Sequence, residues 1–441
     1  MRSNMKNRVH IQWLIMAALL TGVFTLHSNA AELPQYAAEK HMGVATCANS
    51  TCHSVTQLEE PSNVLQNEYR TWLFHDRHSK AYTTLLSDAS KRIAAKLGIE
   101  SAATADVCLD CHSDNVPEDK RGPEFYLTDG VGCEACHGGS EKWIGRHILT
   151  PYSAERNQVD GMYPSSDLAA RTKLCAGCHV GNQKKLASHT IMGAGHPRLG
   201  FELDTFTIRQ PEHYVVDDDY IARKNPDNPV LRLLVGSAVQ AQTMANNLTG
   251  ELVDHPQGHP EIVLYDCHSC HHSLSDLKWQ QRPSTAGLKP GAIRLNDSSF
   301  ILLAGLIGAL DGDLQRSMLS AIKRLHLAST TSVKDLQAAA KSLNSLAIQS
   351  QRLFENATVN DVQKSQMLEA LMRLGANGEY RDYVSAEQAV MAMDALSYSL
   401  PSDPALTKLI NEAYQTTADD EAYQSNRFKK DLQEYLKQNL K

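Results

Sequence analysis

The ten cysteines of this 441-residue chain restrict its fold more than any other feature of the sequence. They form five pairs, and a histidine directly follows the second cysteine of every pair. Two residues separate the cysteines in four of the pairs, and four residues separate them in the first pair. The cysteines are Cys47 and Cys52, Cys108 and Cys111, Cys133 and Cys136, Cys175 and Cys178, and Cys267 and Cys270. The histidines that follow them are His53, His112, His137, His179 and His271.

Three kinds of site use closely spaced cysteines: a disulfide framework, a structural zinc site and a covalently attached haem. A disulfide framework gives no reason for a histidine after each pair. Zinc takes Cys and His ligands in groups of four, and five two-cysteine clusters do not divide in that way. In C-x-x-C-H, two thioethers hold the porphyrin and the histidine becomes the proximal iron ligand. The sequence therefore predicts five covalently bound haem c groups.

The first pair departs from this spacing, because Cys47 and Cys52 enclose the four residues "ANST". We expect a bulged attachment loop there, since the closing Cys-His step is kept. A structural disulfide between these two cysteines is the alternative.

The second axial ligand of each iron bears directly on function, because a second histidine closes the iron and an open face can bind substrate. His272 directly follows the motif histidine His271. Adjacent residues of a helix project about 100° apart, so these two cannot reach one metal, and His272 is predicted to ligate a neighbouring haem. His78 is preferred to His75, which shares its helix face. His268, inside the fifth motif, is expected to face solvent.

The first thirty residues predict a secretory signal: basic residues, an apolar run, and then Ser28 and Ala30 at the small-residue positions of a cleavage site. An uncleaved membrane anchor is the alternative. No later segment approaches the roughly 18 uninterrupted apolar residues that a spanning helix needs. We therefore expect a soluble protein that is periplasmic or otherwise exported, with no stable membrane span after signal cleavage.

The charge of the mature chain restricts its partners. Removal of the signal leaves 40 Lys and Arg against 50 Asp and Glu, a net charge of −10. This balance argues against nucleic acid and anionic lipid as partners. It favours redox partner proteins that carry basic docking patches.

The sequence changes in character after the last cysteine. Residues 31–290 are expected to form a pentahaem cytochrome c domain of short helices and loops, in which porphyrins supply much of the apolar core. Residues 291–441 contain no cysteine, and apolar residues recur there at helical spacing, as in 332–354. Asp403 and Asp419 stand where helix N-caps would fall. The predicted fold is mainly α with little regular sheet, and it ends in a helical bundle that serves homo-oligomerisation, partner docking or only as a cap.

Three stretches, "DGVGCEACHGG", "AGHPRLGFELDTF" and "LYDCHSCHHSL", resemble a multihaem c-type cytochrome superfamily. This superfamily includes hydroxylamine oxidoreductase, the tetrahaem cytochrome that receives its electrons, and pentahaem nitrite reductase. The resemblance covers about residues 40–285 and implies haems stacked in near-parallel pairs that exchange electrons edge to edge. It implies distal iron ligands at His78, His147, His189, His196 and His272.

Two functions are compatible with these features. The leading hypothesis is a carrier that passes electrons between redox partners through closely packed, mostly bis-histidine haems. The alternative is a reductase or oxidase of small nitrogen or sulfur oxyanions with one open-faced haem, marked by the first motif or by the surroundings of His213. Pentahaem nitrite reductases commonly carry lysine in place of one motif histidine, whereas all five motifs here end in histidine. No catalytic residue is assigned.

Overall fold

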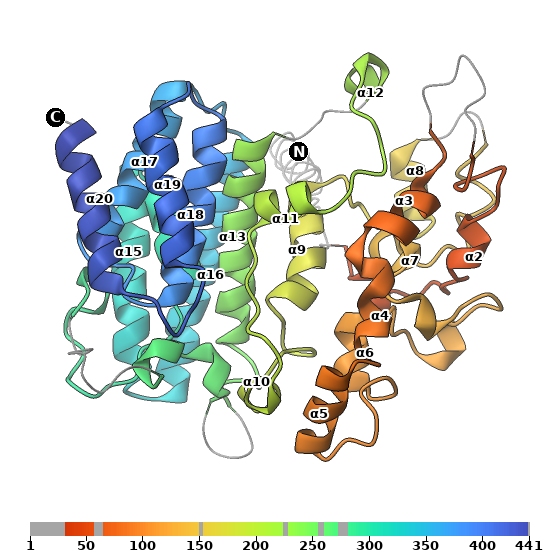
Figure 1. Ribbon diagram of the computed structural model, residues 1–441, viewed down its shortest axis with the longest axis horizontal. Coiled ribbons are helices and arrows are strands. Elements are labelled where there is room, and N and C mark those ends of the chain that lie inside the picture. Colours follow the sequence, from red (N-terminus) through yellow and green to blue (C-terminus); the bar gives the residue numbers. More distant parts are fainter. Residues whose placement is uncertain are drawn as a thin grey trace, which may run out of the picture. The chain divides into compact units, whose positions relative to one another are not determined.

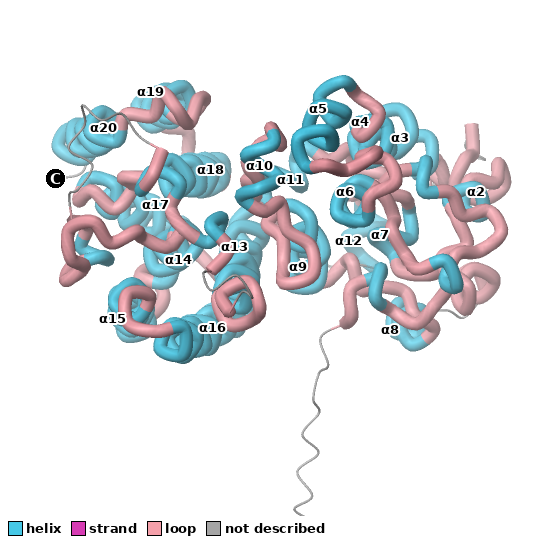
Figure 2. The backbone as a smooth tube through the Cα atoms, turned by 90° about the horizontal axis from the view of Figure 1, so that it is seen from below, coloured by secondary structure: helices cyan, strands magenta, loops and turns pink. Residues whose placement is uncertain are grey.

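The fold consists of helices and loops (Figures 1 and 2). The computed structural model describes residues 31–56, 65–149, 153–223, 228–254, 260–271 and 281–439. Within these residues, extended pairing is limited to two isolated bridges, His41 with Arg121 and Tyr265 with Leu295. The predicted mainly α fold class is confirmed.

Short helices make up the part of the chain that carries the first four cysteine motifs. They are α2 (Val44–Cys47), α3 (Glu68–His75), α4 (Ala81–Thr84), α5 (Asp88–Leu97), α6 (Asp106–His112), α7 (Cys133–His137), α8 (Ala154–Val159), α9 (Leu168–His179), α10 (His189–Ala194), α11 (Leu203–Arg209) and α12 (Asp218–Arg223). Single 3-10 turns lie among them at η1 (Pro34–Tyr36), η2 (Arg77–Lys80), η3 (Glu118–Lys120) and η4 (Leu127–Asp129).

The hydrophobic clusters of this part are small. One contains Leu85, Ala94, Ala102, Ala103 and Leu109, and the other contains Ala176, Phe201 and Leu203. A folded region of this length ordinarily buries a larger share of apolar side chains. The small clusters therefore fit the expectation that bound apolar groups complete the interior.

Longer helices form the main hydrophobic core. They are α13 (Pro229–Asn247), α14 (Ser298–Ile307), α15 (Gly312–Ala328), α16 (Val333–Glu355), α17 (Asp361–Ala376), α18 (Tyr383–Tyr398), α19 (Pro404–Thr416) and α20 (Ser425–Asn439). Figure 1 shows α13 and α15–α20 running side by side. Their facing sides bury Leu, Ile, Val, Met and Phe residues in one continuous cluster, and each such side chain contributes about 1.5–3 kcal/mol when fully buried.

Helix α13 belongs to this core although it precedes the predicted domain border at residues 290 and 291. It packs against α14, α16 and α18, and also against α9, whose C-terminus carries the fourth motif. Contacts group Leu33–Lys441 as one compact unit. The border stays a prediction.

The two predicted N-caps differ in outcome. Asp403 accepts a hydrogen bond from the Ala405 backbone N–H and caps α19, as expected. The prediction for Asp419 is wrong, because α20 begins only at Ser425. The intervening turn is anchored instead by the buried side chain of Tyr423, whose hydroxyl donates to the Tyr380 carbonyl at 2.7 Å.

A buried ionic cluster joins the segment after the fifth motif to the bundle. The Arg282 side chain is fully buried and donates to both carboxylate oxygens of Asp297, at 2.8 and 2.9 Å, and to Asp382 at 3.0 Å. His326 Nε2 lies 2.8 Å from the same Asp297 carboxylate. Burial alone would raise the pKa of Asp297, but Arg282 and His326 outweigh burial and hold that pKa well below its usual range. The carboxylate is therefore charged and depends on Arg282.

Replacement of Arg282 by methionine should strongly destabilise the bundle. The change leaves two buried carboxylates without their guanidinium partner, and we expect the free energy of unfolding to fall by about 3–5 kcal/mol. Chemical denaturation followed by far-UV circular dichroism measures the loss. The matched control is Arg324→Met, which removes an exposed arginine and should change stability by less than about 0.5 kcal/mol. Equal stabilities for the two variants would contradict the assigned role.

Candidate haem-binding sites

The motifs from the second to the fourth lie at helix C-termini. In α6, α7 and α9 the two cysteines and the histidine occupy positions i, i+3 and i+4, so all three share one helix face. The fifth motif lies on the 3-10 turn η6 (Cys267–Ser269), between η5 (Ile262–Leu264) and η7 (Pro283–Thr285). Local backbone geometry therefore presents each cysteine pair and its histidine together.

The first motif forms the expected bulge. Helix α2 ends at Cys47, and Asn49 then organises a turn. The Thr51 backbone N–H donates to Asn49 Oδ1 at 2.9 Å, and the Cys52 N–H donates to the Asn49 carbonyl at 2.9 Å. This turn accommodates the two additional residues between the cysteines.

Each motif histidine faces a second histidine from elsewhere in the chain. The ring centroids are 6.1 Å apart for His53 and His147, 6.2 Å for His78 and His179, 6.3 Å for His112 and His196, 6.3 Å for His137 and His213, and 6.2 Å for His189 and His271. All five pairs therefore share nearly one spacing, although their interplanar angles range from 14° to 87°.

This spacing fits a single metal ion between two imidazoles. A metal–imidazole bond is about 2.0 Å long, and a ring nitrogen lies about 1.2 Å from its ring centroid, so two trans ligands would have centroids about 6.4 Å apart. Direct ring stacking or hydrogen bonding between imidazoles would bring the centroids closer. The residues present thus fit a haem iron at each motif.

Hydrogen bonds at Nδ1 orient several of these rings. Two rings face carboxylates: His53 Nδ1 lies 3.0 Å from Glu68 Oε2, and His78 Nδ1 lies 2.8 Å from Asp76 Oδ1. Three others face backbone carbonyl oxygens, with His112 Nδ1 3.1 Å from Ala81, His147 Nδ1 3.3 Å from Trp143 and His196 Nδ1 2.7 Å from Pro197. An Nδ1–H that donates leaves the lone pair on Nε2, which is the atom that would bind the iron.

Neighbouring carboxylates raise the pKa of some of these histidines, whereas burial lowers the pKa of others. The hydrogen bond with Glu68 raises the pKa of His53, and that with Asp76 raises the pKa of His78. Burial, assisted by His78, lowers the pKa of His179 to about 4 and keeps its imidazole neutral. A neutral imidazole is the form that binds a metal, and a carboxylate on Nδ1 increases the basicity of the opposite nitrogen.

The predicted distal ligands His78, His147, His189 and His196 each face a motif histidine. His272 lies outside the described residues. His213, which faces His137, was not predicted as a ligand. It lies 76 residues beyond its partner in a loop, and no local pattern marks it. The ligand assignments stay predictions.

The remaining described histidines have other surroundings. His75 is exposed. His41 is buried, with Nδ1 2.7 Å from Asp114 Oδ2. The prediction that His268 faces solvent is wrong: it is half-buried against Tyr383 and Tyr423, and its Nε2 lies 3.2 Å from the Asp420 carbonyl. The bundle covers this residue, which a motif alone does not reveal.

Comparison with known families extends this picture. Residues 45–138 match the profile of the family described as Cytochrome c554 and c-prime. This segment is a cytochrome c554-family domain. Its range contains the first three cysteine motifs, and a domain of this multihaem cytochrome family implies covalently bound haem c in this segment. No curated protein and no solved structure matches the chain.

Cytochromes of the c type are typically exported. In the described part of the chain, no helix combines the length and the apolar character that crossing a membrane requires.

The cysteines of different motifs approach one another in and beyond the cytochrome c554-family domain. The side chain of Cys47 lies next to that of Cys133, and the side chain of Cys111 lies next to that of Cys178. Burial raises the pKa of Cys136, and the nearby Cys175 raises it further. The first motif therefore meets the third, the second meets the fourth, and the third meets the fourth.

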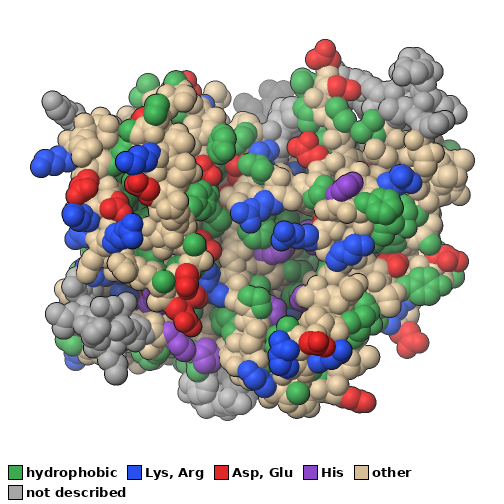
Figure 3. Space-filling view, in the orientation of Figure 1, with side chains coloured by type: hydrophobic (Ala, Val, Ile, Leu, Met, Phe, Trp, Pro, Cys, Tyr) green, Lys and Arg blue, Asp and Glu red, His purple; other side chains and the backbone are tan. Residues whose placement is uncertain are grey.

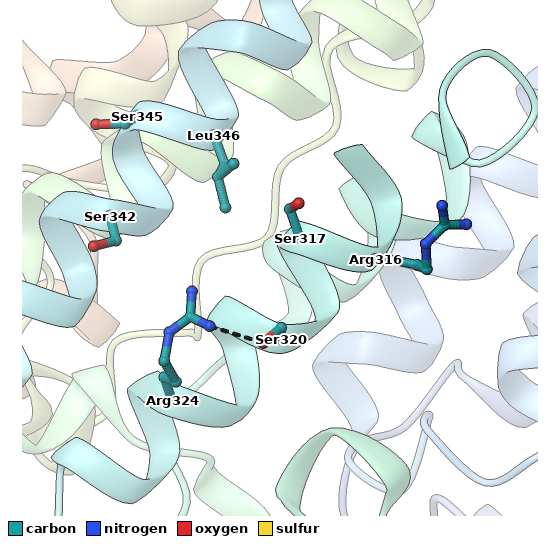
Figure 4. Close-up of a pocket in the computed structure, with 7 residues that line it drawn as sticks. All are labelled: Arg316, Ser317, Ser320, Arg324, Ser342, Ser345 and Leu346. Carbon is teal, nitrogen blue, oxygen red and sulfur yellow. Dashed lines mark hydrogen bonds between the residues drawn. The ribbon is translucent and has the colours of Figure 1, made fainter. Parts of the chain in front are cut away.

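Two hollows differ in their relation to the motifs. A cavity lined by His179, Cys267 and Phe201 brings the fourth and fifth motifs together. Figure 3 shows histidine side chains in a hollow of the surface, with Lys and Arg side chains around it. A separate groove of about 530 Å³ between α15 and α16 is lined by arginines, serines and one leucine, and no motif residue reaches it (Figure 4).

A disulfide framework and a structural zinc site were the alternative uses of the cysteines, and neither is seen among the described residues. All ten cysteines are described, and none of them forms a disulfide bond. No group of three or more His, Cys, Asp or Glu side chains in that part of the chain is arranged to hold a metal ion.

Glu134 connects the third motif of the cytochrome c554-family domain to the N-terminal segment. Its buried carboxylate accepts hydrogen bonds from the backbone N–H groups of Met42 at 2.8 Å, Gly43 at 2.7 Å and Ser140 at 2.7 Å. Gly43 has φ of 101°, and a Cβ there would lie 1.9 Å from the Glu124 carbonyl oxygen. The segment can therefore pass this close to the Glu124 backbone only because residue 43 is glycine.

Replacement of Glu134 by glutamine should loosen this connection. The amide offers one acceptor oxygen in place of two charged ones, and we expect the free energy of unfolding to fall by about 1.5–3 kcal/mol. Guanidinium denaturation of the haem-containing protein measures it. Glu141→Gln, at an exposed glutamate on the following loop, is the control and should be close to neutral. A neutral result at Glu134 would show that its three hydrogen bonds contribute no net stability.

Proposed function

We propose that this protein is an exported pentahaem c-type cytochrome that carries electrons between redox partners through closely packed bis-histidine haems. The observation that carries the proposal is the set of five facing histidine pairs, each with ring centroids 6.1–6.3 Å apart. Five cysteine pairs and five histidine pairs match one haem at each motif.

The facing pairs favour a carrier over a reductase. A haem that binds a small oxyanion needs one open axial position, whereas each motif histidine here has an imidazole opposite it. His213, whose surroundings were the candidate mark of a substrate site, faces His137. The proposed role of His213 is therefore ligation.

Different residues of the chain would hold, ligate and orient the haems. Haem supplies reversible one-electron storage when it is bound. The cysteines hold each group in place, the paired histidines complete its coordination, and Glu68 and Asp76 fix two of the imidazoles. Burial and hydrogen bonds around each group then set its reduction potential.

The contacts between motifs support a continuous route for electrons. The cysteine contacts connect the first motif to the third, the third to the fourth, and the fourth to the second. The shared cavity connects the fourth motif to the fifth. Cys52 of the first motif and Cys270 of the fifth are exposed, so these two motifs are the proposed points where electrons enter and leave.

Removal of one distal histidine tests the ligand pairs. In His213→Gly, one iron loses its sixth ligand, and we expect about one fifth of the haem to change from low-spin to high-spin in the ferric EPR spectrum. Added imidazole should restore the low-spin signal. The control is His75→Gly, at an exposed histidine without a facing partner, which should leave the spectrum unchanged.

Two results would contradict the proposal. The first is a haem content other than five per chain, measured by intact mass and by the pyridine haemochrome spectrum. The second is a high-spin signal in the unaltered protein that shifts on addition of nitrite or hydroxylamine. The second result would instead support the reductase.

We further propose that the redox partners present basic docking patches. The support is the net charge of −10 expected after removal of residues 1–30, together with the negative haem propionates. The rate of electron transfer with a basic partner cytochrome should fall as ionic strength rises from about 0.01 to 1 M, because the Debye length shrinks from about 30 to 3 Å. Stopped-flow absorbance measures this rate, with an uncharged reductant as the control. A rate that is insensitive to salt would exclude electrostatic docking.

A further inference from the structure

Lys185 is a buried lysine beside Cys111 and Cys178, two of the predicted haem-attachment cysteines. It follows α9 in the loop after the fourth motif, and its relative exposure is 8%. Its Nζ lies 3.2 Å from Cys178 Sγ and 3.1 Å from the Asp110 carbonyl oxygen, and it also donates to Gln35 Oε1. These partners come from three separate parts of the chain.

The backbone holds Lys185 in this position. Asn182 Oδ1 accepts hydrogen bonds from the N–H groups of Lys184, at 2.9 Å, and Lys185, at 3.1 Å. The Asn182 N–H donates to the Lys185 carbonyl at 2.7 Å and closes the loop. Gly181 has φ of 88°, in the left-handed region that favours glycine. The tight loop thus fixes the backbone from which the Lys185 side chain reaches Cys178 and Asp110.

The described residues provide no carboxylate within ion-pair distance of Lys185, since its partners are a sulfur, a backbone carbonyl and an amide oxygen. The carboxylate of the adjacent Asp110 accepts instead from Asn115 Nδ2, at 2.8 Å. Burial of an ammonium group without a counter-charge is costly. A charge kept in such a place acts strongly on its neighbours, because the surrounding dielectric constant is low.

The second and fourth motifs meet at this point. The side chains of Cys111 and Cys178 lie next to each other, so the porphyrin edges attached there would also lie close together. Lys185 contacts one of these sulfurs directly. Among the described residues no other lysine is buried to this extent.

We propose that Lys185 is a potential-setting residue whose fixed positive charge raises the reduction potentials of the haems at the second and fourth motifs above those of the other three. The inference rests on the proposed function, because it requires haem at both motifs. The charge stabilises the electron added to either haem, since net charge and hydrogen bonds close to a redox centre tune its potential. Electrons would therefore reside preferentially on this central pair.

Two substitutions separate charge from packing. Lys185→Met keeps most of the aliphatic stem and removes the charge, whereas Lys185→Arg keeps the charge. The control is Lys184→Met, because the Lys184 ammonium belongs to the neighbouring residue and lies 3.9 Å from the centroid of the Tyr36 ring, but its side chain is exposed. Each holoprotein is titrated potentiometrically, with visible and EPR spectra recorded at each potential.

We expect Lys185→Met to lower two of the five midpoint potentials and to leave the other three in place. At a fixed applied potential the reduced-to-oxidised ratio of those two haems should fall about tenfold, which corresponds to about 59 mV for a one-electron couple. Lys185→Arg and Lys184→Met should retain both potentials.

Unchanged potentials in Lys185→Met would overturn the inference. A uniform fall of all five potentials, or an equal fall in Lys185→Arg, would also overturn it, because either result indicates loosened packing and not a lost charge. The haem count of the unaltered protein keeps this test distinct from that of the proposed function. Fewer than five haems would contradict the pentahaem proposal, whereas five haems with unshifted potentials would contradict only the role of Lys185.

Discussion

The constraint on which the haem-bearing part depends is the fixed separation of two imidazoles that face each other. The five pairs join residues that lie 76 to 101 positions apart in the chain. Each pair therefore closes a long loop, which is entropically costly in a region whose hydrophobic clusters are small. In the proposed pentahaem protein, iron coordination at five places would offset that cost and would keep the short helices and loops in a defined arrangement.

The two parts of the chain achieve stability by different means. The bundle buries a continuous set of aliphatic side chains, and the ionic cluster around Arg282 fixes the segment that enters it. The haem-bearing part relies on polar contacts that orient individual groups, such as Glu134 on three backbone N–H groups and Asp76 on His78. Helix α13 packs with both parts, because it contacts α9 on one side and α16 on another.

Much of the fold could be read from the chain because its signals are local. The apolar pattern of 332–354 predicted α16, which spans Val333–Glu355, and Asp403 caps α19. The failures came where tertiary contacts override a local signal. Asp419 resembles a cap, but burial of Tyr423 delays the helix, and His268 is covered by the bundle. His213 carries no local mark of a ligand, because its partner His137 lies in a different segment.

The sequence by itself determined the five cysteine–histidine motifs and so predicts where haem would be attached, because two cysteines and a histidine act together only at short spacing on one turn of backbone. It also determined the mainly helical class, since apolar periodicity is a property of neighbouring residues. Only the tertiary structure decided which histidine faces which motif and which motifs touch. It also placed the ammonium of Lys185 beside Cys178 and the carbonyl of Asp110. Those relations join residues remote in the chain, and their distances exist only once the whole interior is packed.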